Sequence, residues 1–175
     1  MSSLAGKTVI VTGASKGIGA ATAHAVVKAG ARLIAHYGTD RAGAEMATSF
    51  ARDGQVTLLK ADFSNMDAVD DFWRQALKEA DGYIDVLVNN AGIMHQTGGI
   101  EDPIEDWEEA WSHSIAVNVE APARLLRHAV RSWLQAKKTG SIISIGSWVT
   151  TRGTSNPGAI AYAASKAAIA AATKT

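Results

Sequence analysis

The sequence predicts an α/β fold built on a doubly wound parallel sheet, and three observations support this prediction. Short runs of β-branched and apolar residues alternate with longer segments of helical character, as in successive βαβ units. The runs are apolar at nearly every position, which strands buried on both faces of a parallel sheet require. A glycine-rich turn follows the first run and opens a helix, so we expect a Rossmann-type arrangement of these elements.

The first two strands and helices follow one another closely. Residues 7–12 contain Thr-Val-Ile-Val-Thr, a β-branched run that predicts a buried strand. After the glycine turn we expect a helix over 17–29, because Gly30 is the usual type of residue just past a helix end. A second strand is predicted over 32–37 and a second helix over 41–52.

The third and fourth strands enclose one helix. A strand is predicted over 56–61, and Asp62 ends it. The stretch Ser64 to Asp67 resembles a capping box, in which a side chain satisfies the first backbone N–H groups of a helix. We therefore expect a helix from this stretch to about residue 80, followed by a strand over 84–89.

The last third of the chain begins with a long helical stretch over 104–137. Pro122 lies inside it, and we expect the proline to kink this helix or to split it in two. A fifth strand is predicted over 141–145, and a loop rich in glycine, serine and proline over 153–158. The final predicted helix starts near Ala161 and runs to the end of the sequence.

Length and composition set limits on the function. The 175 residues suit one domain, so we expect residues 1–175 to form a single dinucleotide-binding domain. Lysine plus arginine and aspartate plus glutamate both number 17, which argues against nucleic acid or an anionic membrane as a partner. There is no cysteine, so disulfides and thiolate chemistry are excluded.

No metal site, signal peptide or membrane span is expected. The five histidines are scattered without the spacing of metal ligands, and we expect each to lie on the surface or in a loop. No apolar run approaches the length that crosses a bilayer, and a cytoplasmic protein is the default expectation. The histidines are His24, His36, His95, His113 and His128.

The glycine-rich turn predicts a site for the pyrophosphate of a dinucleotide. Its glycines follow a strand and open a helix, which lets backbone amides and the helix N-terminus approach phosphate oxygens. A purely structural turn is the alternative. The residues expected to contact the cofactor here are Gly13, Ser15, Lys16, Gly17, Ile18 and Gly19.

Residues at the end of the second predicted strand indicate whether the cofactor carries a 2′-hydroxyl or a 2′-phosphate on its ribose. Residues 35–38 contain no acidic side chain to bind a ribose 2′-hydroxyl, and Lys16 is placed to face a 2′-phosphate. Lys16 as a solvated loop residue, or Asp40 as the 2′-hydroxyl partner, are the alternatives. We expect NADP(H) in preference to NAD(H), with Tyr37 among the cofactor contacts.

Tyr162-Ala-Ala-Ser-Lys166 places a phenol and an ammonium one helical turn apart on the same face. A nearby cation favours the phenolate, so the two residues suit acid–base work at a carbonyl. A solvent-exposed surface pair is the alternative for these two residues considered without the glycine turn. Together with that turn, the pair predicts hydride transfer between a nicotinamide cofactor and a ketone or secondary alcohol.

With these motifs assembled, the chain resembles the short-chain dehydrogenase/reductase family, and among its members it looks most like 3-oxoacyl-thioester reductases. Thr12 to Gly19 resembles the family's phosphate turn, and Tyr162 and Lys166 match its YxxxK motif. The resemblance implies adenine contact by Asp62 and Phe63. It implies that Asn89, Ala91 and Gly92, in an Asn-Asn-Ala-Gly element, stabilise the sheet and line the cofactor pocket.

The resemblance also implies the catalytic roles. Tyr162 would be the general acid in reduction, and Lys166 would tune it and hold the nicotinamide ribose. Ser147 would donate a hydrogen bond to the substrate oxygen, and Asn118 would hold a water linked to Lys166. Each of Ser147, Asn118 and Asp62 also has a structural alternative, as a turn serine, a helix-kink asparagine and a strand or loop cap.

Two departures from the family pattern bear on function. The interval from Ser147 to Tyr162 is longer than usual, and we expect the extra residues to bulge out near 150–155; Ser144 is the fallback serine. The chain stops soon after Lys166, whereas the resemblance implies two more strands and a substrate-covering lid. We therefore expect a piece of a longer protein. The competing hypothesis is a non-catalytic dinucleotide-binding or interaction module.

The tryptophans and the long helix bear on assembly. Trp107, Trp111 and Trp133 are expected to pack in the core or an interface, whereas Trp148 either walls the substrate site or packs elsewhere. The resemblance implies a homo-oligomer, dimer or tetramer, that uses the long helix and the helix after Tyr162. The subunits would meet through an apolar face, or these residues would pack on the sheet instead. The residues of this face are Trp111, Ile115, Leu125, Leu126 and Ala129.

Overall fold

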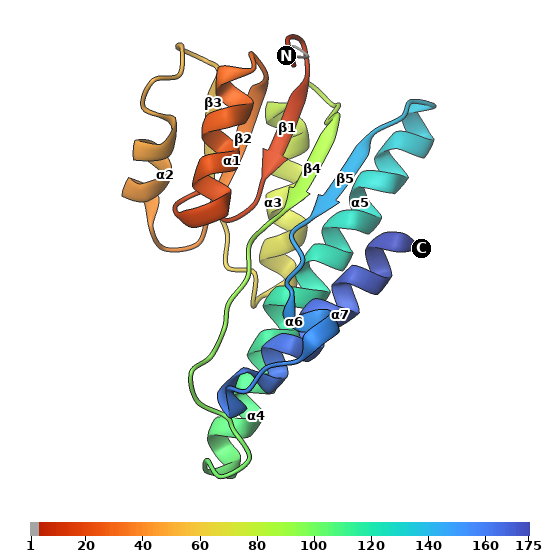
Figure 1. Ribbon diagram of the computed structural model, residues 1–175. Helices are drawn as coiled ribbons and strands as arrows, with labels where there is room; N and C mark the ends of the chain where they lie inside the picture. Colours follow the sequence, from red (N-terminus) through yellow and green to blue (C-terminus); the bar gives the residue numbers. More distant parts are fainter. Residues whose placement is uncertain (1–3) are drawn as a thin grey trace.

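A computed structural model describes residues 4–175 and contains a parallel five-stranded sheet of order β3-β2-β1-β4-β5 (Figure 1). This order confirms the predicted doubly wound α/β fold, because the chain runs outward from β1 in both directions. In register, Val9 pairs with Leu33 on one side and with Val86 on the other. The strands are β1 (Thr8–Val11), β2 (Arg32–Tyr37), β3 (Val56–Lys60), β4 (Val86–Asn89) and β5 (Ser141–Ser144).

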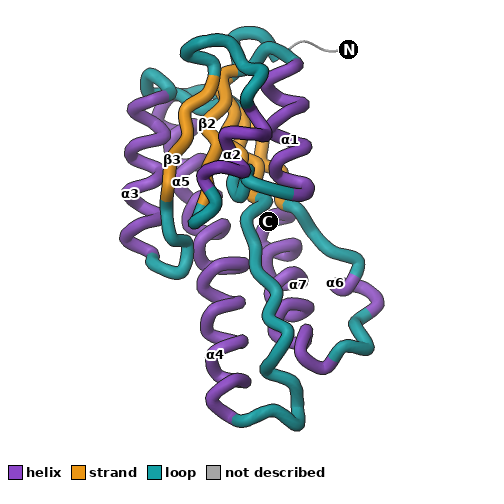
Figure 2. Tube along the Cα trace, turned by 90° about the vertical axis from the view of Figure 1, so that its left-hand side faces the viewer, coloured by secondary structure: helices purple, strands orange, loops and turns teal. Residues whose placement is uncertain are grey.

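Helices connect the strands and cover both faces of the sheet (Figures 1 and 2). Two short segments, α6 (Val149–Arg152) and a 3-10 turn (Pro157–Ala159), lie between Ser147 and Tyr162, the interval in which extra residues were expected. The helices are α1 (Gly17–Lys28), α2 (Arg41–Thr48), α3 (Met66–Glu79), α4 (Ile104–Ile115), α5 (Ala121–Ala136), α6 (Val149–Arg152) and α7 (Ile160–Lys174). A π-helical segment (Ala116–Glu120) joins α4 to α5, and a 3-10 turn (Pro157–Ala159) precedes α7.

Each face of the sheet has its own apolar core. On the side of α1, Val26 and Val27 pack with Val9 and Leu33. On the side of α3 and α5, the core contains Phe72, Leu125, Ala129 and Trp133. Leu125 and Ala129 are therefore buried on the face of α5 that packs against the sheet. The structure thus supports packing on the sheet for these residues, in preference to an exposed face for subunit contact.

Helix α4 and the start of α7 extend beyond the carboxyl ends of the strands (Figures 1 and 2). Figure 2 shows α4, the loop after β4, α6 and the start of α7 projecting together from the sheet. The loops that follow β1, β3, β4 and β5 leave the sheet at this same edge, as they must in a parallel sheet. A site built from these loops is therefore bordered by α4 and α7.

The long helix predicted over 104–137 is divided, but the division precedes Pro122. The Ala121 N–H donates to the Ala116 carbonyl, a bond that spans five residues instead of the usual four. Pro122 has no N–H, so it cannot donate to the Asn118 carbonyl four residues earlier in the α-helical pattern. The irregular turn therefore falls on Ala116–Glu120, and Asn118 lies at its centre.

Several predicted boundaries are wrong by a few residues. The cap of α3 is Asn65, whose Oδ1 accepts the N–H groups of Asp67 and Ala68, because Ser64 is instead engaged by Asp62. Helix α2 ends at Thr48, and β4 begins at Val86. No helix within residues 4–175 combines the length and apolar character needed to cross a membrane.

Strand β5 forms one edge of the sheet and is only partly covered. Ser144 faces α7 and accepts a hydrogen bond from Thr173 Oγ1 (2.8 Å). Ile143 points to the opposite face and is 51% exposed. The expectation of strands that are apolar and buried on both faces therefore fails for β5, in which no residue is fully buried.

Candidate dinucleotide and active site

The turn between β1 and α1 has the backbone conformation that its glycines predict. Gly13 (φ +66°) and Gly17 (φ +56°) adopt left-handed conformations that other residues rarely take. A Cβ at Gly19 would overlap the Gly13 carbonyl oxygen and the Asn90 side chain, so this position requires glycine for space. The turn is thereby held close to the segment that follows β4.

Thr12 and Asn90 clamp this turn to β4. Asn90 Nδ2 donates to the carbonyl oxygens of Thr12 (2.8 Å) and Gly13 (3.1 Å). Thr12 Oγ1 accepts the backbone N–H groups of Asn90 and Ala91, both at 2.9 Å. Sequence reasoning did not assign Asn90 to the site, although it stands beside Asn89 in the motif that was recognised.

Asn89, the neighbouring asparagine, faces the helix layer. Its Nδ2 donates to the Pro122 carbonyl (3.2 Å) and the residue is buried. Its Oδ1 is buried without a hydrogen-bond partner among the described residues. Of the two asparagines, Asn90 therefore holds the phosphate turn, while Asn89 links β4 to α5.

His36 contradicts the expectation of a surface histidine. It is 3% exposed, and its Nδ1 accepts the Gly13 N–H (3.0 Å) while its Nε2 lies 3.1 Å from the Ala61 carbonyl oxygen. The ring stacks on Phe63, with centroids 3.9 Å apart. Burial lowers the pKa of His36 to about 4, so the ring is neutral near pH 7.

The residues beside the end of β2 form the predicted 2′ side of the cofactor site. Ser15 Oγ donates to the Asp40 carbonyl (2.6 Å), which holds the phosphate turn against the β2–α2 loop. The Asp40 carboxylate caps α2 by accepting the Gly43 N–H (2.8 Å). Tyr37 is buried, whereas Lys16 is exposed directly before α1.

Asp62 and Phe63 follow β3, at the same edge of the sheet. Asp62 is exposed, and its Oδ1 accepts the Ser64 N–H (2.9 Å) and the Ser64 hydroxyl (2.7 Å). These hydrogen bonds hold the pKa of Asp62 below its ordinary value, with the backbone bond as the larger cause. Phe63 is buried beneath the His36 ring.

Asn118 ties the π-helical segment to the loop after β4. Its Oδ1 accepts the Ile93 N–H (2.8 Å), and its Nδ2 donates to the Ile93 carbonyl (2.9 Å) and to Ser165 Oγ (3.0 Å). Ser165 Oγ donates in turn to the Tyr162 carbonyl (2.8 Å). Asn118 is thus connected through Ser165 to the first turn of α7.

Lys166 is buried at the base of the same turn. Its Nζ donates to the Ile145 carbonyl (3.0 Å) and lies 5.9 Å from the centre of the half-buried Tyr162 ring. Burial lowers the pKa of Lys166 below its ordinary value. A Cβ at Gly92 would lie 3.1 Å from Asn118 Oδ1 and 3.3 Å from Lys166 Nζ, so the loop after β4 lies close against both side chains.

Ser147 lies two residues beyond the carbonyl that Lys166 contacts. It is half-buried at the start of α6, and its carbonyl accepts the Thr150 hydroxyl (2.9 Å). Ser144, the fallback serine, is occupied by Thr173 of α7. Trp148 is 66% exposed, so within the described residues little packs against its ring.

The other aromatic residues and histidines lie outside this constellation of predicted residues. Trp133 Nε1 donates to the Ile84 carbonyl (2.7 Å) in the core, and Trp107 and Trp111 form a half-buried pair on α4. His128 Nε2 lies 2.7 Å from Asp70 Oδ1, and His95 Nε2 lies 3.2 Å from His113 Nδ1. His95 lies in the loop after β4, as expected, whereas His113 and His128 are half-buried on helices.

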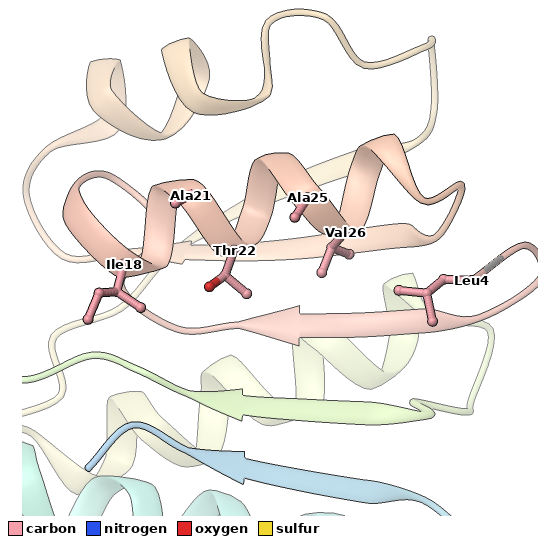
Figure 3. A pocket seen from close by; sticks show the side chains of 6 residues that line it. All are labelled: Leu4, Ile18, Ala21, Thr22, Ala25 and Val26. Carbon is pink, nitrogen blue, oxygen red and sulfur yellow. The ribbon is translucent and has the colours of Figure 1, made fainter. Parts of the chain in front are cut away.

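An apolar hollow of about 440 Å³ lies beside α1 (Figure 3). None of the predicted catalytic residues lines it, and it contacts the predicted cofactor site only through Ile18. Its lining residues are Leu4, Ile18, Ala21, Thr22, Ala25 and Val26. The hollow therefore does not mark the site of the predicted chemistry.

The residues around the phosphate turn fit a dinucleotide. The first turn of α1 contains no acidic side chain to repel a pyrophosphate, and its N–H groups lack partners within the helix. A Cβ at Gly17 would meet no atom within 4 Å, so this part of the turn is open. The phosphate turn, the exposed Asp62 and the Lys166–Tyr162 pair lie in loops and helix starts at one edge of the sheet.

Comparison with known proteins gives a consistent result. Residues 7–175 match the family described as short chain dehydrogenase. A 3-oxoacyl-[acyl-carrier-protein] reductase from Synechocystis is 35% identical over 177 residues, which cover 100% of this chain and 68% of that protein. A 3beta-hydroxysteroid dehydrogenase 1 from Eggerthella lenta is 34% identical and is matched over 98% of this chain and 64% of its own length.

Solved structures agree with these sequence matches. A metagenomic short-chain oxidoreductase in complex with NADP superimposes with a TM-score of 0.79 and is 33% identical, covering 96% of this chain and 73% of that one. A dehydrogenase/reductase from Sinorhizobium meliloti gives a TM-score of 0.75 at 35% identity, covering 97% of this chain and 64% of that one. The chain thus spans about two thirds of the length of these relatives.

Proposed function

The chain belongs to the short chain dehydrogenase family, and on that premise we propose that it forms the cofactor-binding and catalytic part of an NAD(P)(H)-dependent oxidoreductase. The substrate proposed is a small molecule with a ketone or a secondary alcohol. One observation carries the proposal: the buried Lys166 Nζ is bound to the Ile145 carbonyl and sits beneath the Tyr162 ring, next to Gly92 and Asn118. A surface pair of tyrosine and lysine would have no reason to be buried among these segments.

The phosphate turn would hold the cofactor's pyrophosphate, and Asp62 its adenine. Ser15, Gly17, Ile18 and Gly19 lie at the α1 N-terminus, where the helix dipole favours a negative charge. The nicotinamide cofactor supplies the hydride when bound. All remaining steps rest on side chains of this chain.

Tyr162 would donate its hydroxyl proton to the substrate oxygen during reduction and recover it during oxidation. The Lys166 charge lies 5.9 Å from the tyrosine ring and favours the phenolate that remains after proton transfer. Ser147 would donate a hydrogen bond to the oxygen as negative charge develops on it. Asn118 holds the loop after β4 through Ile93 and thereby fixes Gly92 beside Lys166.

We propose NADP(H) as the preferred cofactor. No acidic side chain lies at residues 35–38, and the exposed Lys16 and Arg41 both lie beside the β2–α2 loop. The Asp40 carboxylate, the alternative partner for a 2′-hydroxyl, already caps α2. Titration with NADPH and NADH side by side tests the preference, and equal dissociation constants would contradict it.

The proposed chemistry is tested with Tyr162→Phe, which removes only the hydroxyl. We expect reduction of a panel of ketones by NADPH to fall by at least about a hundredfold, the usual contribution of a positioned acid, while the dissociation constant for NADPH stays within about twofold. Reduction at the wild-type rate by the variant would remove Tyr162 from its proposed role.

A non-catalytic binding or interaction module is the second candidate. The half-exposed Ile143 on the β5 edge favours it, because an uncovered strand edge with apolar side chains is a surface that other polypeptide segments cover. NADPH binding without turnover of any ketone by the wild-type chain would support this candidate.

Val130 and Leu134, both exposed on α5, are the residues we propose for subunit contact in a homo-oligomer, which light scattering tests.

A further inference from the structure

His36 is the residue that joins both halves of the adenosine side of the site. It contacts the phosphate turn twice: its Nδ1 accepts the Gly13 N–H (3.0 Å), and its backbone carbonyl accepts the Ala14 N–H (2.8 Å). Its Nε2 reaches the Ala61 carbonyl, directly before Asp62, and its ring stacks on Phe63. One side chain therefore links the β1–α1 turn to the β3–α3 turn.

The partners of the ring fix its proton. A backbone N–H only donates and a carbonyl oxygen only accepts, so Nδ1 must be bare and Nε2 must carry the hydrogen. A protonated ring would present a hydrogen to the Gly13 N–H and lose that bond. The contacts therefore select the neutral tautomer with the proton on Nε2.

Within residues 4–175, no charged group compensates for the burial of this ring. The contacts from β1, β3 and α3 are the Gly13 N–H, the Ala61 carbonyl, and the rings of Phe63 and Phe72. An apolar side chain would leave the half-buried Gly13 N–H and the buried Ala61 carbonyl without these partners.

We propose that His36 is a positioning residue for dinucleotide binding, which fixes the phosphate turn by accepting the Gly13 N–H. The proposal rests on the proposed function, since it assigns His36 a role in binding the cofactor. With Gly13 held, the amides that follow it in the chain present a preformed arrangement to a pyrophosphate. Without this bond the turn must be ordered by the ligand, which weakens binding.

Two substitutions separate the two ring nitrogens. His36→Asn keeps an acceptor near the Nδ1 position and shortens the side chain away from Ala61. His36→Gln keeps a donor near the Nε2 position and leaves Gly13 without its acceptor. We expect the dissociation constant for NADPH to rise about tenfold in His36→Gln, the effect of one lost hydrogen bond, and less than about threefold in His36→Asn.

Phe72→Leu is the matched control, because Phe72 touches the same ring edge-on from α3 and offers no acceptor to the Gly13 N–H. It should lower thermal stability as much as the histidine variants do while the NADPH dissociation constant stays within about twofold. The positioning role would be overturned if His36→Asn and His36→Gln weakened NADPH binding equally. It would also be overturned if neither variant weakened NADPH binding. His36→Leu, which also lacks an acceptor, replaces His36→Gln if that variant does not fold.

Amide hydrogen exchange on the free protein keeps this test independent of the proposed function. We expect faster exchange at Gly13 and Ala14 in His36→Gln than in His36→Asn, at matched global stability. If the wild-type chain bound no dinucleotide, the proposed function would fail. The difference in exchange would still show whether His36 holds the phosphate turn. Equal exchange in the two variants would reject the inference even if NADPH binds.

Discussion

Gly19→Ala is the substitution whose effect follows most directly from the structure. The added Cβ would lie 2.9 Å from the Gly13 carbonyl carbon and would overlap the carbonyl oxygen and Asn90 Nδ2. Carbon atoms in contact prefer a separation of about 3.5–4.0 Å, so the phosphate turn or α1 must shift by more than about half an ångström. The backbone atoms cannot rotate away as a flexible side chain would.

The size of the effect is estimated from three contributions. Overpacking of this kind costs about 1–3 kcal/mol. Displacement of Asn90 sacrifices its bonds to the Thr12 and Gly13 carbonyls, at about 1 kcal/mol each. Alanine regains about 1 kcal/mol of helix propensity over glycine. The net expected loss is roughly 3 kcal/mol, divided between folding stability and cofactor affinity.

Urea unfolding and NADPH titration of the same preparations measure the two effects. We expect Gly19→Ala to be clearly less stable than wild type and to bind NADPH at least about tenfold more weakly. Gly38→Ala is the control, because a Cβ there meets nothing within 4 Å and the residue has no left-handed φ. If Gly19→Ala unfolds and binds like the control, the close approach of Gly19 to Gly13 is not the reason for this glycine.

Three further predictions concern stability. The pKa of His36 is about 4 in the native protein and near 6.5 in the unfolded chain. The neutral ring therefore contributes fully to stability above pH 6.5, and up to about 3 kcal/mol of the free energy of unfolding is lost as the pH falls toward 4. Urea unfolding across this range should show a steeper decline for wild type than for His36→Asn. Leu125→Ala, at a fully buried position (0% exposed), should cost about 2–5 kcal/mol in urea unfolding, whereas Met46→Ala (76% exposed) should cost less than about 0.5 kcal/mol; similar values for the two would contradict the described core. Asn118→Asp keeps the shape but cannot donate to the Ile93 carbonyl, and thermal unfolding near pH 7 should show a loss of at least about 2 kcal/mol, which acidification should reduce.

The sequence was sufficient for the fold because its signals are local and repeated. Most strands are short, largely apolar runs, and Gly30 follows the end of α1 in a left-handed conformation (φ +90°). The π-helical turn was not predictable in this way, because one extra residue in a turn does not change the residue types around it. Pro122 indicated that the long helix is interrupted, but the interruption lies upstream, where the proline leaves the Asn118 carbonyl without its α-helical donor.

The sequence offered candidates for the site where several residues form a local motif, and it offered none where a single side chain contacts distant backbone groups. Tyr162, Lys166 and Asn118 were recognised as a group, and the structure joins Asn118 to the first turn of α7 through Ser165. Their catalytic roles remain predictions. The role of His36 was missed because its two partners are a backbone N–H and a backbone carbonyl, which no residue pattern reveals.

The π-helical segment has a consequence for comparing or recombining this chain with its relatives. Each residue of a regular α-helix turns the following residues by about 100°, so loss of one residue from Ala116–Glu120 would rotate α4 by that amount against α5. Asn118 would then no longer face Ile93, although every other residue of the helix were retained. Chimeric proteins should therefore exchange the whole segment from α4 to α5, and a gap placed inside it in an alignment signals a changed site, not a neutral deletion.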